Sequence, residues 1–180
     1  HCLVPHEQHL WKIGGLYCNM SNGGQCEMSA STYVLTDGRW QEGPSLMQER
    51  YAHACATTPS AIYEGKELLV VAGGIVSWWN SASVEIHLEG SYKFTPGPPL
   101  PHPLVEPAMV SLPTSLLISG GGYYLDEATN NPNSYTFSAN LWEWVCNAQQ
   151  CLWEERRQKM ASGRKYHAML LIPDEFTDCK

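Results

Sequence analysis

The chain has 180 residues, of which 43% are hydrophobic and 16% are charged, and its formal net charge is −7. This composition excludes an intrinsically disordered chain, and no apolar run reaches the ~20 residues that a membrane helix needs. The negative charge argues against nucleic acid or an anionic membrane surface as the main partner. The 15 glycines and 12 prolines favour many short strands over long helices. We therefore expect an all-β domain with no nucleic-acid and no membrane partner.

The expected strands fall, in chain order, into three units of similar length. The first unit, residues 1–52, has strands at 10–15, 30–35 and 40–43, and His1-Cys2 resembles the tail of an earlier inner strand. The second unit, residues 53–106, has strands at 53–57, 67–74, 83–88 and 92–95. The third unit, residues 107–166, has strands at 108–112, 115–121, 134–138 and 151–155. Residues 167–180 begin a further unit, with an inner strand at 167–172.

Three markers recur in the same order in these units. Apolar runs end in the glycine pairs Gly14-Gly15, Gly73-Gly74 and Gly120-Gly121. The pattern Leu/Met-x3-Arg-x2-His-Ala occurs at 46–54 and at 160–168, and residues 100–108 keep its register without Arg and His. An aromatic residue precedes each of these alanines by 14 or 15 positions: Trp40, Phe94 and Trp153. Glycine at a strand end permits positive φ and close backbone approach, and the aromatic residue can fill a wedge between sheets.

The combined pattern resembles the kelch repeat, whose units of about 50 residues form the four-stranded blades of a β-propeller. The resemblance covers nearly the whole chain. It implies a kelch-type β-propeller segment of about three four-stranded blades in an incomplete ring, because propellers typically have 4–8 blades. On this basis we expect a segment of a longer propeller, or a chain that associates to complete one. The missing blades of its own parent chain are then one candidate partner.

The seven cysteines indicate disulfides in a secreted chain and metal or redox chemistry in a cytosolic one. Polar inserts separate Cys18 from Cys26 and Cys146 from Cys151, which makes two local, loop-closing disulfides plausible. The odd count leaves at least one cysteine unpaired within the chain. Asn19-Met20-Ser21 is a glycosylation sequon. These features favour an extracellular or secreted protein, with a cytoplasmic one as the alternative.

A binding surface follows from the kelch resemblance, because kelch proteins that capture peptides use two kinds of loop on one face. The loops after the glycine pairs carry Trp78-Trp79 and Tyr123-Tyr124, and exposed aromatic residues are typical interface anchors. The alternative is that one residue of each pair packs against a neighbouring blade. The loops that lead into the next inner strand carry Arg50 and Arg164. These suit carboxylate ligands, although structural capping is the favoured interpretation and the net charge disfavours an anionic ligand.

The sequence offers little evidence for catalysis. His1, His6 and His9 lie close together but lack a fourth ligand at suitable spacing, so we expect no metal and no cofactor. His53 and His167 hold equivalent positions and are expected to be packed and hydrogen-bonded. We expect a non-enzymatic interaction module that binds a protein or peptide. A fragment of a galactose-oxidase-like copper oxidase, or of an intracellular kelch scaffold or ubiquitin-ligase adaptor, remains an alternative.

Overall fold

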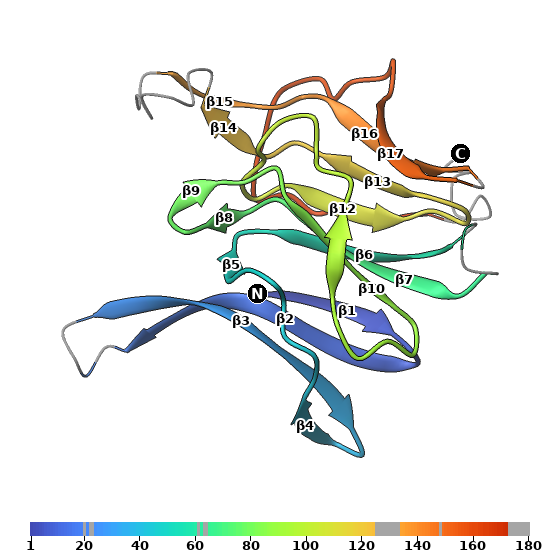
Figure 1. The fold of residues 1–180 in the computed structure, drawn as a ribbon. Coiled ribbons are helices and arrows are strands. Elements are labelled where there is room, and N and C mark those ends of the chain that lie inside the picture. Colours follow the sequence, from blue (N-terminus) through green and yellow to red (C-terminus); the bar gives the residue numbers. More distant parts are fainter. Residues whose placement is uncertain are drawn as a thin grey trace, which may run out of the picture.

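The computed structural model describes residues 1–19, 21, 24–60, 62, 65–124, 134–147 and 149–172. The strands in these ranges form three four-stranded sheets, one three-stranded sheet and one two-stranded sheet. Within the same ranges, no helix is long and apolar enough to cross a membrane. The three large sheets follow one another along the chain as blades of a β-propeller, stacked from the blue end of the chain to the orange end (Figure 1). The prediction of an all-β fold with a propeller arrangement of sheets is confirmed.

Each blade is an antiparallel sheet. The first blade contains β1 (Cys2–His6), β2 (His9–Asn19), β3 (Gln25–Thr36) and β4 (Arg39–Glu42), in that spatial order. The second contains β6 (Ala54–Pro59), β7 (Glu67–Ala72), β10 (Val84–Leu88) and β11 (Thr95–Gly97). The third contains β12 (Ala108–Ser111), β13 (Leu116–Ser119), β16 (Leu141–Cys146) and β17 (Cys151–Glu155).

The small sheets lie beside the blades. Strands β5 (Arg50–Tyr51), β8 (Ile75–Val76) and β9 (Trp79–Asn80) form one of them. The hairpin of β14 (Gly122–Tyr124) and β15 (Tyr135–Phe137) forms the other.

The second blade is buried on both sides, and its central strand β7 shows why. Leu69 and Val71 belong to an apolar cluster shared with the first blade, whereas Leu68 and Val70 belong to a cluster shared with the third blade. All four side chains are at most 1% exposed. A strand with two buried faces requires a continuous apolar run instead of an alternating one, and Leu68-Leu69-Val70-Val71-Ala72 is such a run.

The glycine pairs lie where the segments leading into successive blades cross. Gly73 has φ +70°, and a Cβ there would lie 2.5 Å from the carbonyl oxygen of Leu104, which leads into the third blade. Gly74 has φ +86°, and a Cβ there would lie 2.4 Å from the carbonyl oxygen of Tyr51, which leads into the second blade. At Gly120 a Cβ would meet the carbonyl oxygen of Arg164 at 2.5 Å. Each glycine pair therefore accommodates backbone from neighbouring units, which a side chain would obstruct.

Two strand predictions for the last part of the chain are wrong. The third strand of the third blade is β16, which pairs with β13, whereas the predicted strand at 134–138 belongs to the hairpin of β14 and β15. Residues 167–172 form no strand, and Leu170, Leu171 and Ile172 are exposed. A strand needs a hydrogen-bonded neighbour, and no described strand pairs with this segment.

Three disulfides connect the cysteines of the described residues. Cys18–Cys26 closes the hairpin of β2 and β3, and Cys146–Cys151 closes the hairpin of β16 and β17, as the sequence predicts. The third, Cys2–Cys55, joins β1 of the first blade to β6 of the second. Cys179 lies outside the described residues. Three disulfides are typical of proteins from oxidising compartments.

Candidate functional site

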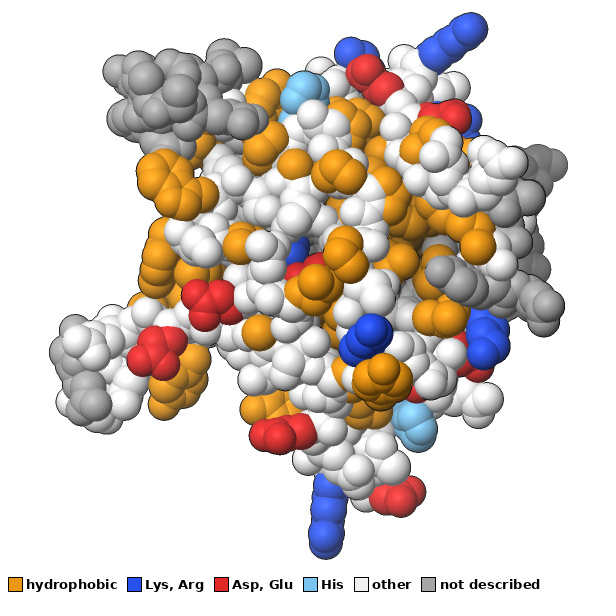
Figure 2. Space-filling view, in the orientation of Figure 1, with side chains coloured by type: hydrophobic (Ala, Val, Ile, Leu, Met, Phe, Trp, Pro, Cys, Tyr) orange, Lys and Arg blue, Asp and Glu red, His pale blue; other side chains and the backbone are white. Residues whose placement is uncertain are grey.

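Three hairpins project from the same side of the propeller. They are the end of β2 and β3, the hairpin of β8 and β9, and the hairpin of β14 and β15, all on the left of Figure 1. We call this side the hairpin face and define it by the described residues of 16–28, 75–80 and 122–137. Hydrophobic side chains line this edge in Figure 2. The exposed ones are Leu16, Tyr17, Trp78, Trp79 and Phe137.

Trp78 is held in an unfavourable backbone conformation at the centre of this face. Val76 pairs with Trp79, so Ser77 and Trp78 form a two-residue turn in which both have positive φ, +50° and +69°. Such turns favour Asn and Gly, and positive φ is unusual for a bulky side chain. The side chains of Trp78 and Trp79 are each 60% exposed, and the Trp78 ring contacts Tyr51 edge-on at 6.2 Å. Neither tryptophan is buried against a neighbouring blade.

Tyr123 and Tyr124, the other predicted aromatic pair, are partly buried. The Tyr123 ring stacks on His102 at 5.9 Å and packs against the cluster between the second and third blades. The Tyr124 ring contacts Tyr135 across the hairpin at 4.9 Å. This pair therefore contributes chiefly to packing, while Trp78 and Trp79 remain available to a partner.

A groove beside Trp78 is acidic. It has a volume of about 350 Å³ and is lined by Trp78, Met28, Cys26 and two carboxylates, Glu27 and Glu49. An aromatic and a thioether side chain beside two negative charges favour a ligand with an apolar group and a cationic group.

Arg50 does not lie on this surface, which corrects its inclusion among the binding residues. It is fully buried, and its Nη2 donates to Oε1 of Glu85 at 2.7 Å. Its Nη1 donates to the carbonyl oxygens of Gly73 and Ser83. Glu85 also accepts hydrogen bonds from the backbone N–H groups of Met47 and Gln48. Arg50 is therefore a structural residue that fastens the segment between the first two blades to β10.

Arg164 holds the equivalent repeat position but is exposed. Its guanidinium donates to the carbonyl and hydroxyl oxygens of Ser162, and its carbonyl oxygen accepts from the N–H of Gly121. Two residues with the same place in the repeat thus have different surroundings. The role of Arg164 in ligand binding stays a prediction.

The three aromatic markers differ in burial. Phe94 and Trp153 are buried between blades, and Trp153 donates its indole N–H to the carbonyl oxygen of Pro98 in the preceding blade. Trp40 is 46% exposed, on the face of the first blade that is turned away from the second. Asn19, the sequon residue, ends β2 at the tip of the hairpin face, and its glycosylation stays a prediction.

The two histidines at the repeat marker are packed in different ways. His53 is buried, and neither ring nitrogen has a hydrogen-bond partner among the described residues. Burial, reinforced by the nearby charge of Arg50, lowers the pKa of His53 to about 3. His167 is hydrogen-bonded through Nε2 to the hydroxyl of Ser119. The expected hydrogen bond is therefore well formed at His167, whereas at His53 only the backbone of Ile13 comes near the ring, without the geometry of a full hydrogen bond.

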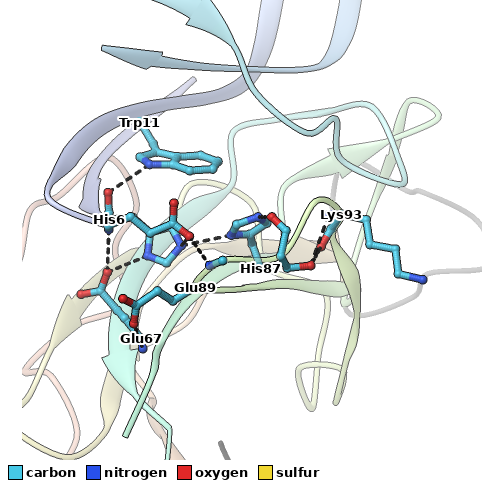
Figure 3. Close-up of polar contacts among 9 residues, drawn as sticks. His6, Trp11, Glu67, His87, Glu89 and Lys93 are labelled. Carbon is cyan, nitrogen blue, oxygen red and sulfur yellow. Dashed lines mark hydrogen bonds and ion pairs between the residues drawn. The ribbon is translucent and has the colours of Figure 1, made fainter. Parts of the chain in front are cut away.

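A second cluster of functional side chains lies at the opposite end of β2 from the hairpin tip. His6 ends β1, His87 lies in β10 of the second blade, and both are 1% exposed. Nε2 of His6 is 3.1 Å from Nδ1 of His87, and Nδ1 of His6 is 2.6 Å from Oε2 of Glu67 (Figure 3). Burial lowers the pKa of His87. This cluster joins the first two blades through polar groups inside an aromatic environment of Trp11 and Phe94.

In the sequence His6 lies close to His1 and His9, a group for which we expect no metal, whereas its partners in the structure are Glu67 and His87. No local pattern indicates this contact, because His87 is 81 positions from His6. One signal for His87 is present in the strand Val84-Glu85-Ile86-His87-Leu88. The alternation places His87 on the opposite face from Val84 and Ile86, and this face of β10 packs against the first blade.

No protein-family model matches the chain, and no curated protein matches it. The fold itself defines the class: a β-propeller of small antiparallel sheets, with a hairpin face on one side and a buried histidine cluster on the other.

Proposed function

We propose that the chain is a non-enzymatic protein-interaction module built from kelch-type repeats, and that it works outside the cell. Its ligand is a protein or peptide segment that binds the hairpin face. The conformation of Trp78 carries this proposal. A bulky residue at φ +69° costs of the order of 1 kcal/mol or more relative to glycine, and its ring is largely left in water. Strain of this kind is typical of ligand-binding positions.

The groove next to Trp78 defines the ligand chemistry. Glu27 and Glu49 lie beside Trp78 and Met28, and no lysine or arginine lines this groove among the described residues. We therefore propose a ligand segment with one large apolar side chain and an adjacent Lys or Arg. An adaptor that binds acidic peptides would instead need a positively charged surface. Arg50 cannot contribute to such a surface, because it is buried.

The disulfides support the extracellular setting over the intracellular-adaptor alternative, because cytosolic thiols are kept reduced. They also disfavour the copper-oxidase alternative. Such an enzyme needs a Tyr–Cys crosslink, and six of the seven cysteines are joined in Cys2–Cys55, Cys18–Cys26 and Cys146–Cys151.

A peptide-display selection against the disulfide-bonded protein tests the proposal. We expect enriched peptides to combine a large apolar residue with Lys or Arg, and their binding to weaken as salt is raised. Trp78→Gly should abolish binding while leaving the melting temperature unchanged or higher, because glycine relieves the positive φ. Tyr92→Ala is the matched control, since Tyr92 is 84% exposed but lies in the β10–β11 turn. Selected peptides that bind Trp78→Gly as tightly as the wild type would contradict the proposal.

A further inference from the structure

His6, Glu7, Glu67 and His87 form a cluster of ligand-type side chains between the first two blades. Glu7 follows His6 in the turn between β1 and β2, and one ligand atom from each of His6, Glu7 and His87 lies within 4.8 Å of the others. The turn belongs to the first blade, while Glu67 and His87 belong to the second. Any ion bound here would hold the two blades together.

The hydrogen bonds determine which ring nitrogens carry protons. The carbonyl oxygen of Ser91 can only accept, so Nε2–H of His87 donates to it at 2.8 Å. The carboxylate of Glu67 accepts from the backbone N–H of Glu7, and it likewise accepts from Nδ1–H of His6. In the neutral imidazoles this leaves a lone pair on Nε2 of His6 and another on Nδ1 of His87.

These two lone pairs face each other at 3.1 Å. Two acceptors at that distance repel unless a positive centre lies between them, and the centre is either a shared proton or a metal ion. Both nitrogens can lie 2.0–2.1 Å from one Zn²⁺ ion, with an angle at the metal of roughly 100°, close to the tetrahedral value. The third atom, Oε1 of Glu7, is 3.8 Å from Nε2 of His6. Small rotations of the Glu7 side chain bring this oxygen within bonding distance of the same ion.

The surroundings have the features of a metal site. Glu67 orients His6 through its distal nitrogen, and the Ser91 carbonyl orients His87 in the same way, as is usual for metal-binding histidines. Oε1 of Glu7 accepts from the N–H of Gly90 at 2.6 Å. Figure 3 shows His6, His87 and Glu67 directed toward one another beneath Trp11, whose indole N–H donates to the carbonyl oxygen of His6.

The site also has an entrance and a favourable charge. A cavity of about 420 Å³ adjoins it, lined by Glu7, Gln8, Glu67, Glu89 and Gly90. Three carboxylates around one cavity attract a divalent cation. The turn that presents Glu7 is strained, because Glu7 and Gln8 have φ +52° and +62° where Asn-Gly is favoured. That conformation places the Glu7 carboxylate beside His6 and the cavity.

We propose that His6, His87 and Glu7 bind one Zn²⁺-class transition-metal ion between the first two blades, with Glu67 as the positioning residue and the cavity supplying water as a fourth ligand. Two imidazoles and one carboxylate are a ligand set that zinc accepts. The site lies at the His9 end of β2 and the hairpin face at the Asn19 end, about 30 Å apart for an 11-residue strand. Its test is therefore independent of the peptide-binding test.

The experiment uses chelator-treated, disulfide-intact protein whose Cys179 thiol has been alkylated, so that no thiol can serve as a ligand. Isothermal titration with Zn²⁺ should show one equivalent bound, and a Co²⁺-loaded sample should show the visible absorption of a four-coordinate site. His87→Gln keeps a donor toward Ser91 and removes the ligand nitrogen, and His6→Asn does the same toward Glu67. Both should abolish the stoichiometric site and the rise in melting temperature that Zn²⁺ causes.

Two further variants sharpen the result. Glu67→Gln should weaken Zn²⁺ binding roughly 10- to 100-fold without changing the stoichiometry, as expected for a positioning residue. His9→Gln is the matched control, because His9 is exposed in the same hairpin, and it should bind Zn²⁺ as the wild type does. The proposal is overturned if the wild type shows no one-to-one binding, which would leave a proton shared by the histidines. It is equally overturned if folded His87→Gln binds Zn²⁺ as tightly as His9→Gln.

Discussion

The side chains of Arg50 and Glu85 form a buried ion pair, 2.7 Å between Nη2 and Oε1, that connects the end of the first unit to the third strand of the second blade. Both side chains are nearly inaccessible, at 0% and 4% exposure. Each charge has further hydrogen-bond partners, so the desolvation of the pair is compensated by several contacts.

Removing one member of this pair should destabilise the protein strongly. Glu85→Gln or Arg50→Met leaves an uncompensated buried charge, and we expect a loss of about 3–5 kcal/mol in the free energy of unfolding, measured by urea denaturation. The control is Lys159→Ala, which breaks the exposed pair with Glu155 and should cost less than about 1 kcal/mol. Similar losses in the buried and exposed variants would contradict this account.

Acid should destabilise the protein through His53. Its pKa is about 3 in the folded protein and about 6.5 when unfolded, so the unfolded state binds the proton more tightly. The stabilisation is complete above pH 6.5 and is lost as the pH falls toward 3, at up to about 1.4 kcal/mol per pH unit. When the pH is lowered from 7 to 5, the free energy of unfolding of His53→Gln, measured by urea denaturation, should fall by about 2 kcal/mol less than that of the wild type. An unchanged pH profile would exclude this residue as the cause, and His9→Gln serves as the control.

The glycine pairs predict a difference between two glycines with nearly the same φ. Gly73 and Gly38 have φ +70° and +74°, but an added Cβ meets the Leu104 carbonyl oxygen at Gly73 and nothing within 4 Å at Gly38. Gly38→Ala should cost about 1 kcal/mol for its backbone conformation alone. Gly73→Ala should cost roughly 3 kcal/mol or more, because backbone must also move. Thermal and chemical denaturation of both variants measure the difference. Equal losses in the free energy of unfolding would show that the backbone around Leu104 moves aside at little cost.

The disulfide between blades should stabilise the fold more than the one within a hairpin. Cys2 and Cys55 are separated by 53 positions, and Cys146 and Cys151 by 5. From loop-closure entropy, removing the first should cost about 4 kcal/mol and removing the second about 2 kcal/mol. Paired Cys→Ser variants, compared by urea denaturation without reductant, provide the measurement. The reverse order of stability would indicate that loop closure is not the controlling factor.

Much of the fold could be predicted because its signals are local. The apolar run of β7, the alternation in β10 and the glycine pairs each report on a few consecutive residues. Strand β16 was missed because the third strand of the last blade was assigned to residues 134–138, which left Leu141–Cys146 without a strand assignment. The hairpin tryptophans were also identified locally, although their backbone strain became visible only in the structure.

The rest of the site depends on how blades pack. Cys2–Cys55 and the contact of His6 with His87 each join residues more than fifty positions apart. Their pairing depends on the angle and separation of neighbouring blades, which no short pattern encodes. The burial of Arg50 has the same origin, because its partner Glu85 comes from the following unit. The repeat pattern of Arg50 and Arg164 could not distinguish them.

The crossing of entry segments at the glycine pairs has a consequence for how the protein is made. Gly14, Gly73 and Gly120 are each covered by backbone from the segment that leads into the next unit. During synthesis, a blade whose own strands have all left the ribosome still lacks this cover until a further stretch of chain emerges. The residue that covers each glycine lies seven to nine positions beyond the last strand of its blade, so at 5–20 residues per second each nascent blade waits about 0.4–2 s for this cover.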